Sequence, residues 1–137
     1  MERNKRLKIK DMSSLKLVII MGFFASIFGL NAQTSKEITV LDATEFKEKI
    51  SEGKVALVDV RTANEFNAGN IKNSVNIDFF DPQFLSCFSD YDKDEPIYVY
   101  CQSGNRSGKA SKKLAELGFT KIYDLKGGYS GWKNAPK

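Results

Sequence analysis

The stretch from Ile97 to Ser107, IYVYCQSGNRS, constrains the fold more than any other part of this 137-residue chain. Its first four residues are apolar or aromatic and predict a short buried strand, which ends where Cys101 opens a polar loop. From Ser107 the apolar residues follow a helical spacing, and Gly118 predicts the end of that helix. We therefore expect Cys101 on a loop between the carboxyl end of a strand and the amino end of a helix.

This position of Cys101 favours a reactive thiol. Backbone N–H groups in the first turn of a helix lack intrahelical partners and carry the positive end of the helix dipole, so they stabilise a nearby anion. At such sites the pKa of a cysteine falls from about 8.5 to roughly 3.5–7.5, and the charge of Arg106 acts in the same direction. The alternative is a cysteine that packs as a small hydrophobic residue. The glycine, serine, asparagine and arginine of the loop favour the reactive thiol, because a packing cysteine needs no such turn.

The chain contains no histidine, which excludes several kinds of site. Cys–His and Ser–His hydrolases need an imidazole base, so neither mechanism is available. A zinc site is not expected from two cysteines without histidine, and we predict no metal and no cofactor. The remaining chemistry is one in which the loop alone prepares the thiolate.

The rest of the chain predicts an α/β architecture. Asp42 and Glu45 are spaced as a capping box at the start of a helix, which Gly53 ends. Val55–Val60 is a continuous apolar run, typical of a strand buried on both faces of a parallel sheet. Glycines 127 and 128 allow a turn into a closing helix, whose aromatic side chains we expect in the core. The other expected strands are Ile38–Leu41, Ile97–Tyr100 and Ile122–Leu125, and the aromatic residues of the closing helix are Tyr129 and Trp132.

A short helix is also expected after Asp81, which precedes a proline and is a suitable N-cap. We expect its apolar residues, Phe84, Leu85 and Phe88, to pack inward. Cys87 lies on the same helix, and we interpret it as an inert packing residue. A resolving role, in which Cys87 attacks an oxidised or persulfidated Cys101, is the alternative.

The first 32 residues read as a signal peptide. A basic stretch is followed by the apolar run Leu17–Leu30, whose 14 residues are fewer than the roughly 20 needed to span a bilayer but fit a signal-peptide core. We predict cleavage after Ala32, a domain over residues 33–137, and a periplasmic or otherwise exported protein. Because Leu30 is bulkier than the residue usually preferred there, an uncleaved anchor is the alternative, and contact with the membrane would then be limited to this segment.

The positive charge of the chain belongs to this leader. Of 21 basic and 17 acidic residues, residues 1–32 hold six and two, which leaves fifteen of each sign in residues 33–137. The sequence pI of about 9.0 is therefore no evidence for nucleic-acid binding, and we expect none. Lysines near the loop could attract an anionic donor or simply form a solvated helix face. These residues are Lys109, Lys112, Lys113 and Lys126.

Three segments together resemble the rhodanese sulfurtransferases, in the order of that family. They are DVRTANEFNAGNIKNSVNI (Asp59–Ile77), CQSGNRS (Cys101–Ser107) and GGYSGW (Gly127–Trp132). The resemblance covers about Ile38 to Lys133. It implies a rhodanese-like α/β fold with a small, mostly parallel central sheet flanked by helices on both faces.

The resemblance also implies a double displacement. Rhodaneses take the sulfane sulfur of thiosulfate or a similar small anionic donor onto the loop cysteine and pass it to an acceptor such as cyanide or a thiol. Carried over to this chain, Cys101 would be the nucleophile and would form a persulfide. The loop amides would then stabilise it, since a hydrogen bond to a charged acceptor contributes roughly 1.5–3 kcal/mol. These amides belong to Gln102, Ser103, Gly104, Asn105, Arg106 and Ser107.

Loop length separates sulfur from phosphorus chemistry. The cell-cycle phosphatases that resemble rhodaneses have five residues between cysteine and arginine, whereas four residues separate Cys101 from Arg106. The shorter cradle suits one sulfur atom better than a tetrahedral phosphate, so phosphatase or arsenate reductase activity is not favoured.

Asp59, Arg61 and Glu65 match charged positions of the family after its second strand. In a parallel sheet this strand end faces the ligand crevice, so we expect Asp59 to brace the Cys101 loop and Arg61 to pair with Glu65. All three are interpreted as supporting residues. Asn70 and Asn73 stand where the family often has histidine and glycine, which leaves the local geometry there undefined.

Two other functions remain compatible with the same fold. One is a sulfur-carrier or redox module that exchanges sulfur with a protein partner and has little activity on thiosulfate. The other is a catalytically silent interaction domain.

Overall fold

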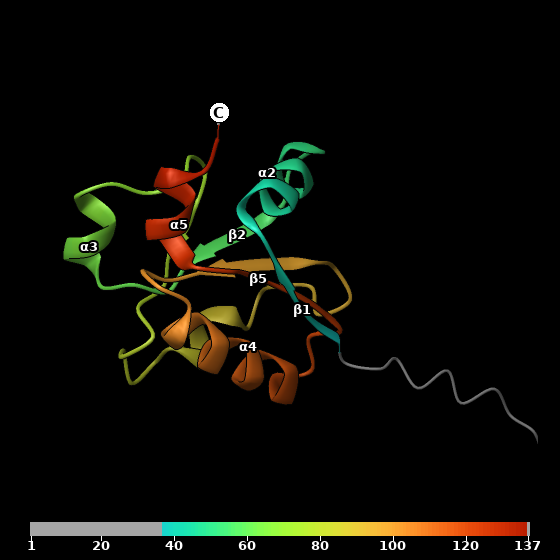
Figure 1. Ribbon diagram of the computed structural model, residues 1–137. Helices are drawn as coiled ribbons and strands as arrows, with labels where there is room; N and C mark the ends of the chain where they lie inside the picture. Colours follow the sequence, from blue (N-terminus) through green and yellow to red (C-terminus); the bar gives the residue numbers. More distant parts are fainter. Residues whose placement is uncertain (1–36, 137) are drawn as a thin grey trace, which may run out of the picture. The chain divides into compact units, whose positions relative to one another are not determined.

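The computed structural model describes residues 37–136, in which five parallel strands form one sheet in the order β1-β5-β4-β2-β3 (Figure 1). The predicted signal peptide lies outside the described residues. The four predicted strands are confirmed, with no end shifted by more than one residue, and β3 is an additional short strand that no run in the sequence indicated. The strands are β1 (Glu37–Leu41), β2 (Ala56–Asp59), β3 (Val75–Asn76), β4 (Ile97–Tyr100) and β5 (Lys121–Leu125).

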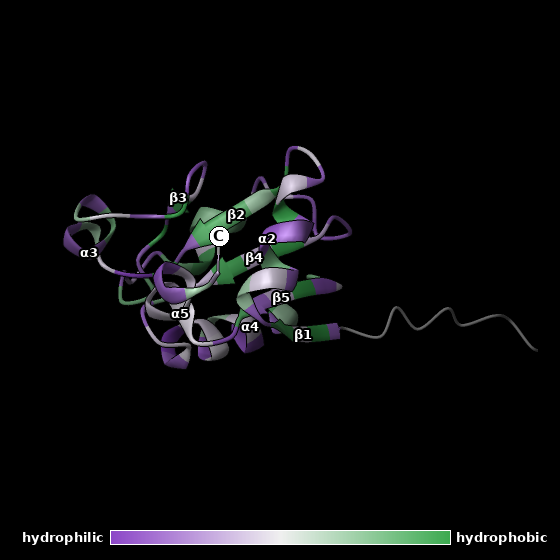
Figure 2. Cartoon of the chain, turned by 45° about the horizontal axis from the view of Figure 1, so that its top comes forward, coloured by the Kyte–Doolittle hydropathy of each residue, from purple (hydrophilic) through white to green (hydrophobic). Residues whose placement is uncertain are grey.

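Helices cover both faces of the sheet, as predicted (Figure 1). One face packs against α4 through a core cluster that includes Val99, Leu114 and Ile122, and the other packs against α2 and α5 through a cluster that includes Phe46 and Tyr98. Figure 2 shows that the hydrophobic residues are concentrated along the strands between these layers. The helices are α2 (Ala43–Ser51), α3 (Ala63–Asn67), α4 (Asn105–Leu117) and α5 (Gly128–Asn134), with a 3₁₀ helix η1 (Leu85–Phe88).

Local signals in the sequence set the ends of these helices. The predicted capping box of α2 is formed, with the Glu45 amide 2.9 Å from the Asp42 carboxylate and the Asp42 amide 3.2 Å from the Glu45 carboxylate. Gly118 ends α4 in the left-handed conformation that glycine adopts without steric cost. The start of α4 was predicted two residues too late, because the helix begins at Asn105.

The segment after Asp81 differs from its prediction. The Asp81 carboxylate accepts a hydrogen bond from the Gln83 amide at 2.8 Å, but only the 3₁₀ turn η1 follows. Phe84 and Phe88 are buried as expected, whereas Leu85 is 39% exposed and Cys87 is exposed, so their predicted inward packing is wrong. A single turn can bury only one side, and the two phenylalanines occupy it.

Within residues 37–136, no helix is long and apolar enough to cross a bilayer. The same residues contain no cluster of side chains that could hold a metal ion.

Candidate active site

Cys101 lies at the carboxyl end of β4, directly after Tyr100, and its side chain is 1% exposed. The loop that follows is short, because Gly104 is already the N-cap of α4. Asn105 and Arg106, which precede the predicted start of the helix at Ser107, already belong to its first turn. The sulfur therefore lies beside the free amides of a helix amino terminus, the arrangement that favours an anion.

Hydrogen bonds reach the sulfur from this short loop. The Gly104 amide donates to Cys101 Sγ at 3.1 Å. Burial by itself raises the pKa of the Cys101 thiol, but hydrogen bonds from the hydroxyl and amide of Ser107 and from the amides of Gly104 and Ser103 outweigh it. The net pKa lies below the ordinary value for cysteine. The loop thus favours the thiolate without a neighbouring base.

The amino end of α5 holds the loop from the other side. The Tyr129 amide donates to the Cys101 carbonyl at 2.8 Å, and the Ser130 amide donates to the Gln102 carbonyl at 3.1 Å. Gly128 makes this approach feasible, since a Cβ atom at that position would lie 2.5 Å from the Cys101 carbonyl oxygen. The sequence indicates a turn at this glycine pair but gives no sign of which backbone Gly128 approaches.

Asp59 and Arg61 form a buried ion pair beside the loop. Arg61 is 2% exposed and Asp59 fully buried, and three guanidinium contacts to the carboxylate span 2.6–3.0 Å. Arg61 also donates to the Gln102 side chain at 3.0 Å and to the Gly69 carbonyl at 2.7 Å. Asp59 therefore reaches the loop through Arg61 rather than by direct hydrogen bonds, and the predicted Arg61–Glu65 pair is wrong.

Glu65 pairs with Arg106 of α4 instead. Two guanidinium nitrogens of Arg106 each donate a hydrogen bond of 2.8 Å to a different carboxylate oxygen of Glu65. Glu65 is also the third residue of α3 and completes a capping box with Thr62, which turns its carboxylate away from Arg61 and towards the loop. The hydrogen bond from Arg106 lowers the pKa of Glu65 to about 2, against the opposing effect of burial. The charge of Arg106 is thus largely balanced by Glu65, and the loop hydrogen bonds favour the Cys101 thiolate more directly.

Comparison with known proteins identifies the family. The family model for the rhodanese-like domain matches residues 42–135. This chain belongs to the rhodanese-like family. YqhL of Bacillus subtilis, an uncharacterized protein, is 34% identical over 121 residues, which are 88% of this chain and 94% of YqhL.

This rhodanese-like chain is also similar to a named sulfurtransferase and to a solved structure. The thiosulfate sulfurtransferase GlpE of Shewanella oneidensis is 36% identical over 81 residues, 59% of this chain and 78% of GlpE. The crystal structure of a rhodanese-related protein from Thermoplasma volcanium is similar with a TM-score of 0.61 at 30% identity, covering 70% of this chain and 91% of that one. At the level of the family, the chain therefore groups with sulfurtransferases.

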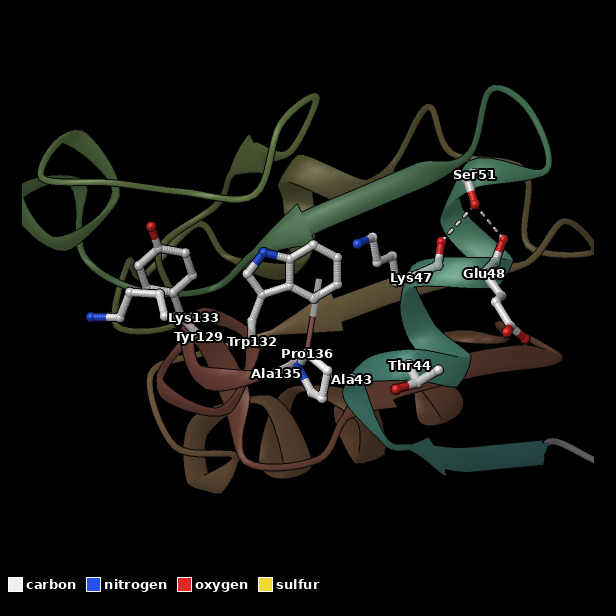
Figure 3. Close-up of a pocket in the computed structure, with 10 residues that line it drawn as sticks. All are labelled: Ala43, Thr44, Lys47, Glu48, Ser51, Tyr129, Trp132, Lys133, Ala135 and Pro136. Atoms are coloured by element: carbon white, nitrogen blue, oxygen red, sulfur yellow. Dashed lines mark hydrogen bonds between the residues drawn. The ribbon is translucent and has the colours of Figure 1, made fainter.

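A groove of about 620 Å³ lies between α2 and α5 of the rhodanese-like domain (Figure 3). Tyr129 and Trp132 line it from α5, and both also pack against the core on the α2 side. The prediction that these aromatic residues belong to the core is therefore confirmed in part, because both are half-buried at its edge. The residues that line the groove include no part of the Cys101 loop, so a ligand bound there would lie apart from the thiol.

Proposed function

We propose that this rhodanese-like protein is a sulfurtransferase that carries sulfane sulfur as a persulfide on Cys101. The observation that carries the proposal is the buried sulfur at the start of α4, with the Gly104 amide 3.1 Å away and a thiol pKa lowered by the surrounding hydrogen bonds. The name of the Shewanella relative, a thiosulfate sulfurtransferase, supports thiosulfate as a donor.

In the proposed reaction, the Cys101 thiolate attacks the outer sulfur of thiosulfate. The bond between the two sulfur atoms of the donor breaks, its electron pair leaves with sulfite, and a persulfide anion remains on Cys101. Cyanide or a thiolate then attacks the outer sulfur and leaves as thiocyanate or a new persulfide, which regenerates the Cys101 thiolate. Neither step needs a base, in keeping with a chain that lacks histidine.

The amides of residues 102–107 are proposed to stabilise the negative charge throughout this cycle. The charge moves from Cys101 Sγ to the outer sulfur of the persulfide and back. Free amides at the start of α4 can follow it without rearrangement, because their direction is fixed by the helix. The supporting role of Arg61 is to hold the Gln102 side chain, and that of Glu65 is to hold Arg106.

Intact-mass measurement after incubation with thiosulfate tests the proposal. We expect the protein to gain one sulfur atom, to lose it on addition of cyanide, and to gain none as the Cys101→Ser variant. Gain from a persulfidated protein but not from thiosulfate would replace the enzyme with a sulfur carrier. Lack of gain from either donor would leave only an interaction domain.

We propose in addition that residues 1–32 direct export and are removed after Ala32. The support is the basic stretch followed by a 14-residue apolar run. Sequencing the amino terminus of the protein from the host's periplasmic or secreted fraction is expected to give Gln33. Recovery of the uncleaved chain in the membrane fraction would replace cleavage with anchoring.

A further inference from the structure

Gln102, the residue after Cys101, is held at three points. Its carbonyl accepts a hydrogen bond from the Ser130 amide at 3.1 Å, and its side-chain Nε2 donates to Ser130 Oγ at 2.8 Å. The third contact is at the other end of the carboxamide, where Oε1 accepts from Arg61 at 3.0 Å. Ser130 therefore binds both the backbone and the side chain of Gln102, yet it has no role in the reaction proposed for Cys101.

The two ends of the Gln102 carboxamide meet groups of different hydrogen-bonding character. A guanidinium group can only donate, so Arg61 fixes Oε1 on its own side, and Nε2 then faces the Ser130 hydroxyl. Arg61 is itself held in place, since it is 2% exposed and paired with Asp59. The carboxamide thus ties Ser130 of α5 to a buried ion pair at the end of β2.

The contact with the Gln102 carbonyl also sets the direction of the next amide. All peptide bonds within residues 37–136 are trans, so the Ser103 N–H points opposite to the Gln102 carbonyl. Because that carbonyl points at α5, the Ser103 N–H points away from α5. The following amide, that of Gly104, donates to Cys101 Sγ at 3.1 Å. The peptide unit that Ser130 holds therefore directly precedes a group that binds the sulfur.

Two successive amides of α5 hold two successive carbonyls of the loop. The Tyr129 amide donates to the Cys101 carbonyl at 2.8 Å, one residue before the contact between Ser130 and Gln102. Tyr129 holds the loop carbonyl through its backbone, whereas Ser130 binds Gln102 through its backbone and its hydroxyl. Removing the Ser130 hydroxyl therefore takes away one contact with the loop and leaves both amide contacts in place.

We propose that Ser130 is a positioning residue for the sulfur site and acts on Cys101 through Gln102. Its hydroxyl holds the Gln102 side chain, and so keeps the peptide unit between Gln102 and Ser103 in the orientation that presents the Ser103 amide to the sulfur. Without the hydroxyl this unit can rotate, and the thiolate loses part of its hydrogen bonding. In support, hydrogen bonds from the amides of Ser103 and Gly104 are among those that lower the pKa of the Cys101 thiol.

The ionisation of Cys101 provides the test. In a Cys87→Ser background, the rate at which iodoacetamide alkylates Cys101 is measured by intact mass between pH 5 and 9, and the midpoint of the profile gives the pKa of the thiol. We expect Ser130→Ala to raise this midpoint by about half a pH unit, because a hydrogen bond to a charged acceptor changes a pKa by about one unit and this one is weakened rather than removed. Ser130→Thr keeps the hydroxyl and is expected to match the wild type.

Asn134→Ala is the matched control. Asn134 lies on the same helix and donates to the Ser130 carbonyl at 3.0 Å, so the change removes a side-chain hydrogen bond to Ser130 but leaves both of its contacts with Gln102. We expect no shift of the alkylation midpoint. A shift equal to that of Ser130→Ala would show a general loosening of α5 and would overturn the proposal.

A double-mutant cycle with Gln102→Met tests the route from Ser130 to the sulfur. Methionine has a side chain of similar length but makes neither contact of the carboxamide. Added to Gln102→Met, Ser130→Ala should therefore move the midpoint by less than half of the shift that it causes alone. Full additivity, or an unchanged midpoint for Ser130→Ala in the presence of Gln102, would each contradict the proposal.

The role of Ser130 in sulfur transfer itself rests on the proposed function. With saturating thiosulfate below the midpoint pH, we expect Ser130→Ala to load Cys101 with sulfur about three-fold more slowly, the factor that half a pH unit represents, with KM unchanged. A normal loading rate in this variant would exclude a role in the reaction. Sulfur transfer could fail with every donor while the alkylation midpoints still shift, so failure of the proposed function and failure of this inference are distinguishable.

Discussion

Glu65 and Arg106 are 41 residues apart in the chain and form a two-point ion pair, with both N···O distances at 2.8 Å. The same Glu65 carboxylate caps α3 through the Thr62 amide at 3.0 Å. One side chain therefore joins the segment after β2 to the first turn of α4, where the reactive cysteine is held.

We expect Glu65→Gln to lower the free energy of unfolding at pH 7 by about 1 kcal/mol, because the pair is bidentate but partly exposed to solvent. The pKa of Glu65 in the folded protein, about 2, lies below its ordinary value of 4.5, so this stabilisation is present above pH 4.5 and is lost as pH falls towards 2. Urea unfolding at pH 7 and pH 3 measures the difference. Glu48→Gln, on the exposed surface of α2, is the control; an equal loss there would remove the special role of Glu65.

Asp59→Asn is expected to destabilise the protein by about 3 kcal/mol. The change leaves the Arg61 guanidinium buried without its counter-ion, and such unpaired buried charges are costly. Adding Arg61→Met to Asp59→Asn should recover part of the loss, since the charge is then removed as well. Urea unfolding of Asp59→Asn, Arg61→Met and the double variant gives the free energies of a double-mutant cycle. If the double variant is no more stable than Asp59→Asn, this account is contradicted.

Gly128→Ala is expected to destabilise the protein by about 3 kcal/mol and to misplace the Cys101 loop. Gly128 has a φ of +58°, and an added Cβ would meet the Cys101 carbonyl at 2.5 Å. Gly131→Ala, in the same helix, places its Cβ 3.4 Å from the nearest atom and should be neutral or stabilising by up to about 1 kcal/mol. Thermal unfolding of both variants tests the contrast; equal stabilities would show that the loop can move aside.

Asn73→Gly is expected to stabilise the protein by about 0.5 kcal/mol. Among residues 37–136, Asn73 is the non-glycine residue with a positive φ, +68°. Glycine removes the steric cost of that conformation, which outweighs its greater freedom in the unfolded chain. Asn67→Gly, in α3, should instead be destabilising. Chemical unfolding measures the free energy of unfolding of both variants, which we expect to rise for Asn73→Gly and to fall for Asn67→Gly.

Cys87→Ser is expected to leave the gain and loss of sulfur on Cys101 unchanged. Cys87 is exposed on η1, and both cysteines are free thiols. Persulfide formation and its discharge to cyanide, followed by intact mass, measure the effect. A persulfide that persists longer in the variant than in the wild type would instead support the resolving role.

Elements whose signals are local could be predicted from the amino-acid sequence. The strand before Cys101, the capping box of Asp42 and Glu45, and the glycine that ends α4 were all predictable, because each depends on residues a few positions apart. The three rhodanese-like segments also contain the residues that the structure gathers around Cys101.

The pairing of the charged groups, in contrast, depends on how the elements pack in three dimensions. Glu65 turned to Arg106 instead of Arg61, because its carboxylate caps α3 on the side that faces α4. The clearance at Gly128 and the burial of Asp124 beneath α4 were equally invisible, since each depends on strands and helices brought together by packing. Spacing along a chain predicts periodicity and caps, but the partner of a side chain is fixed only when segments distant in sequence share a buried interface.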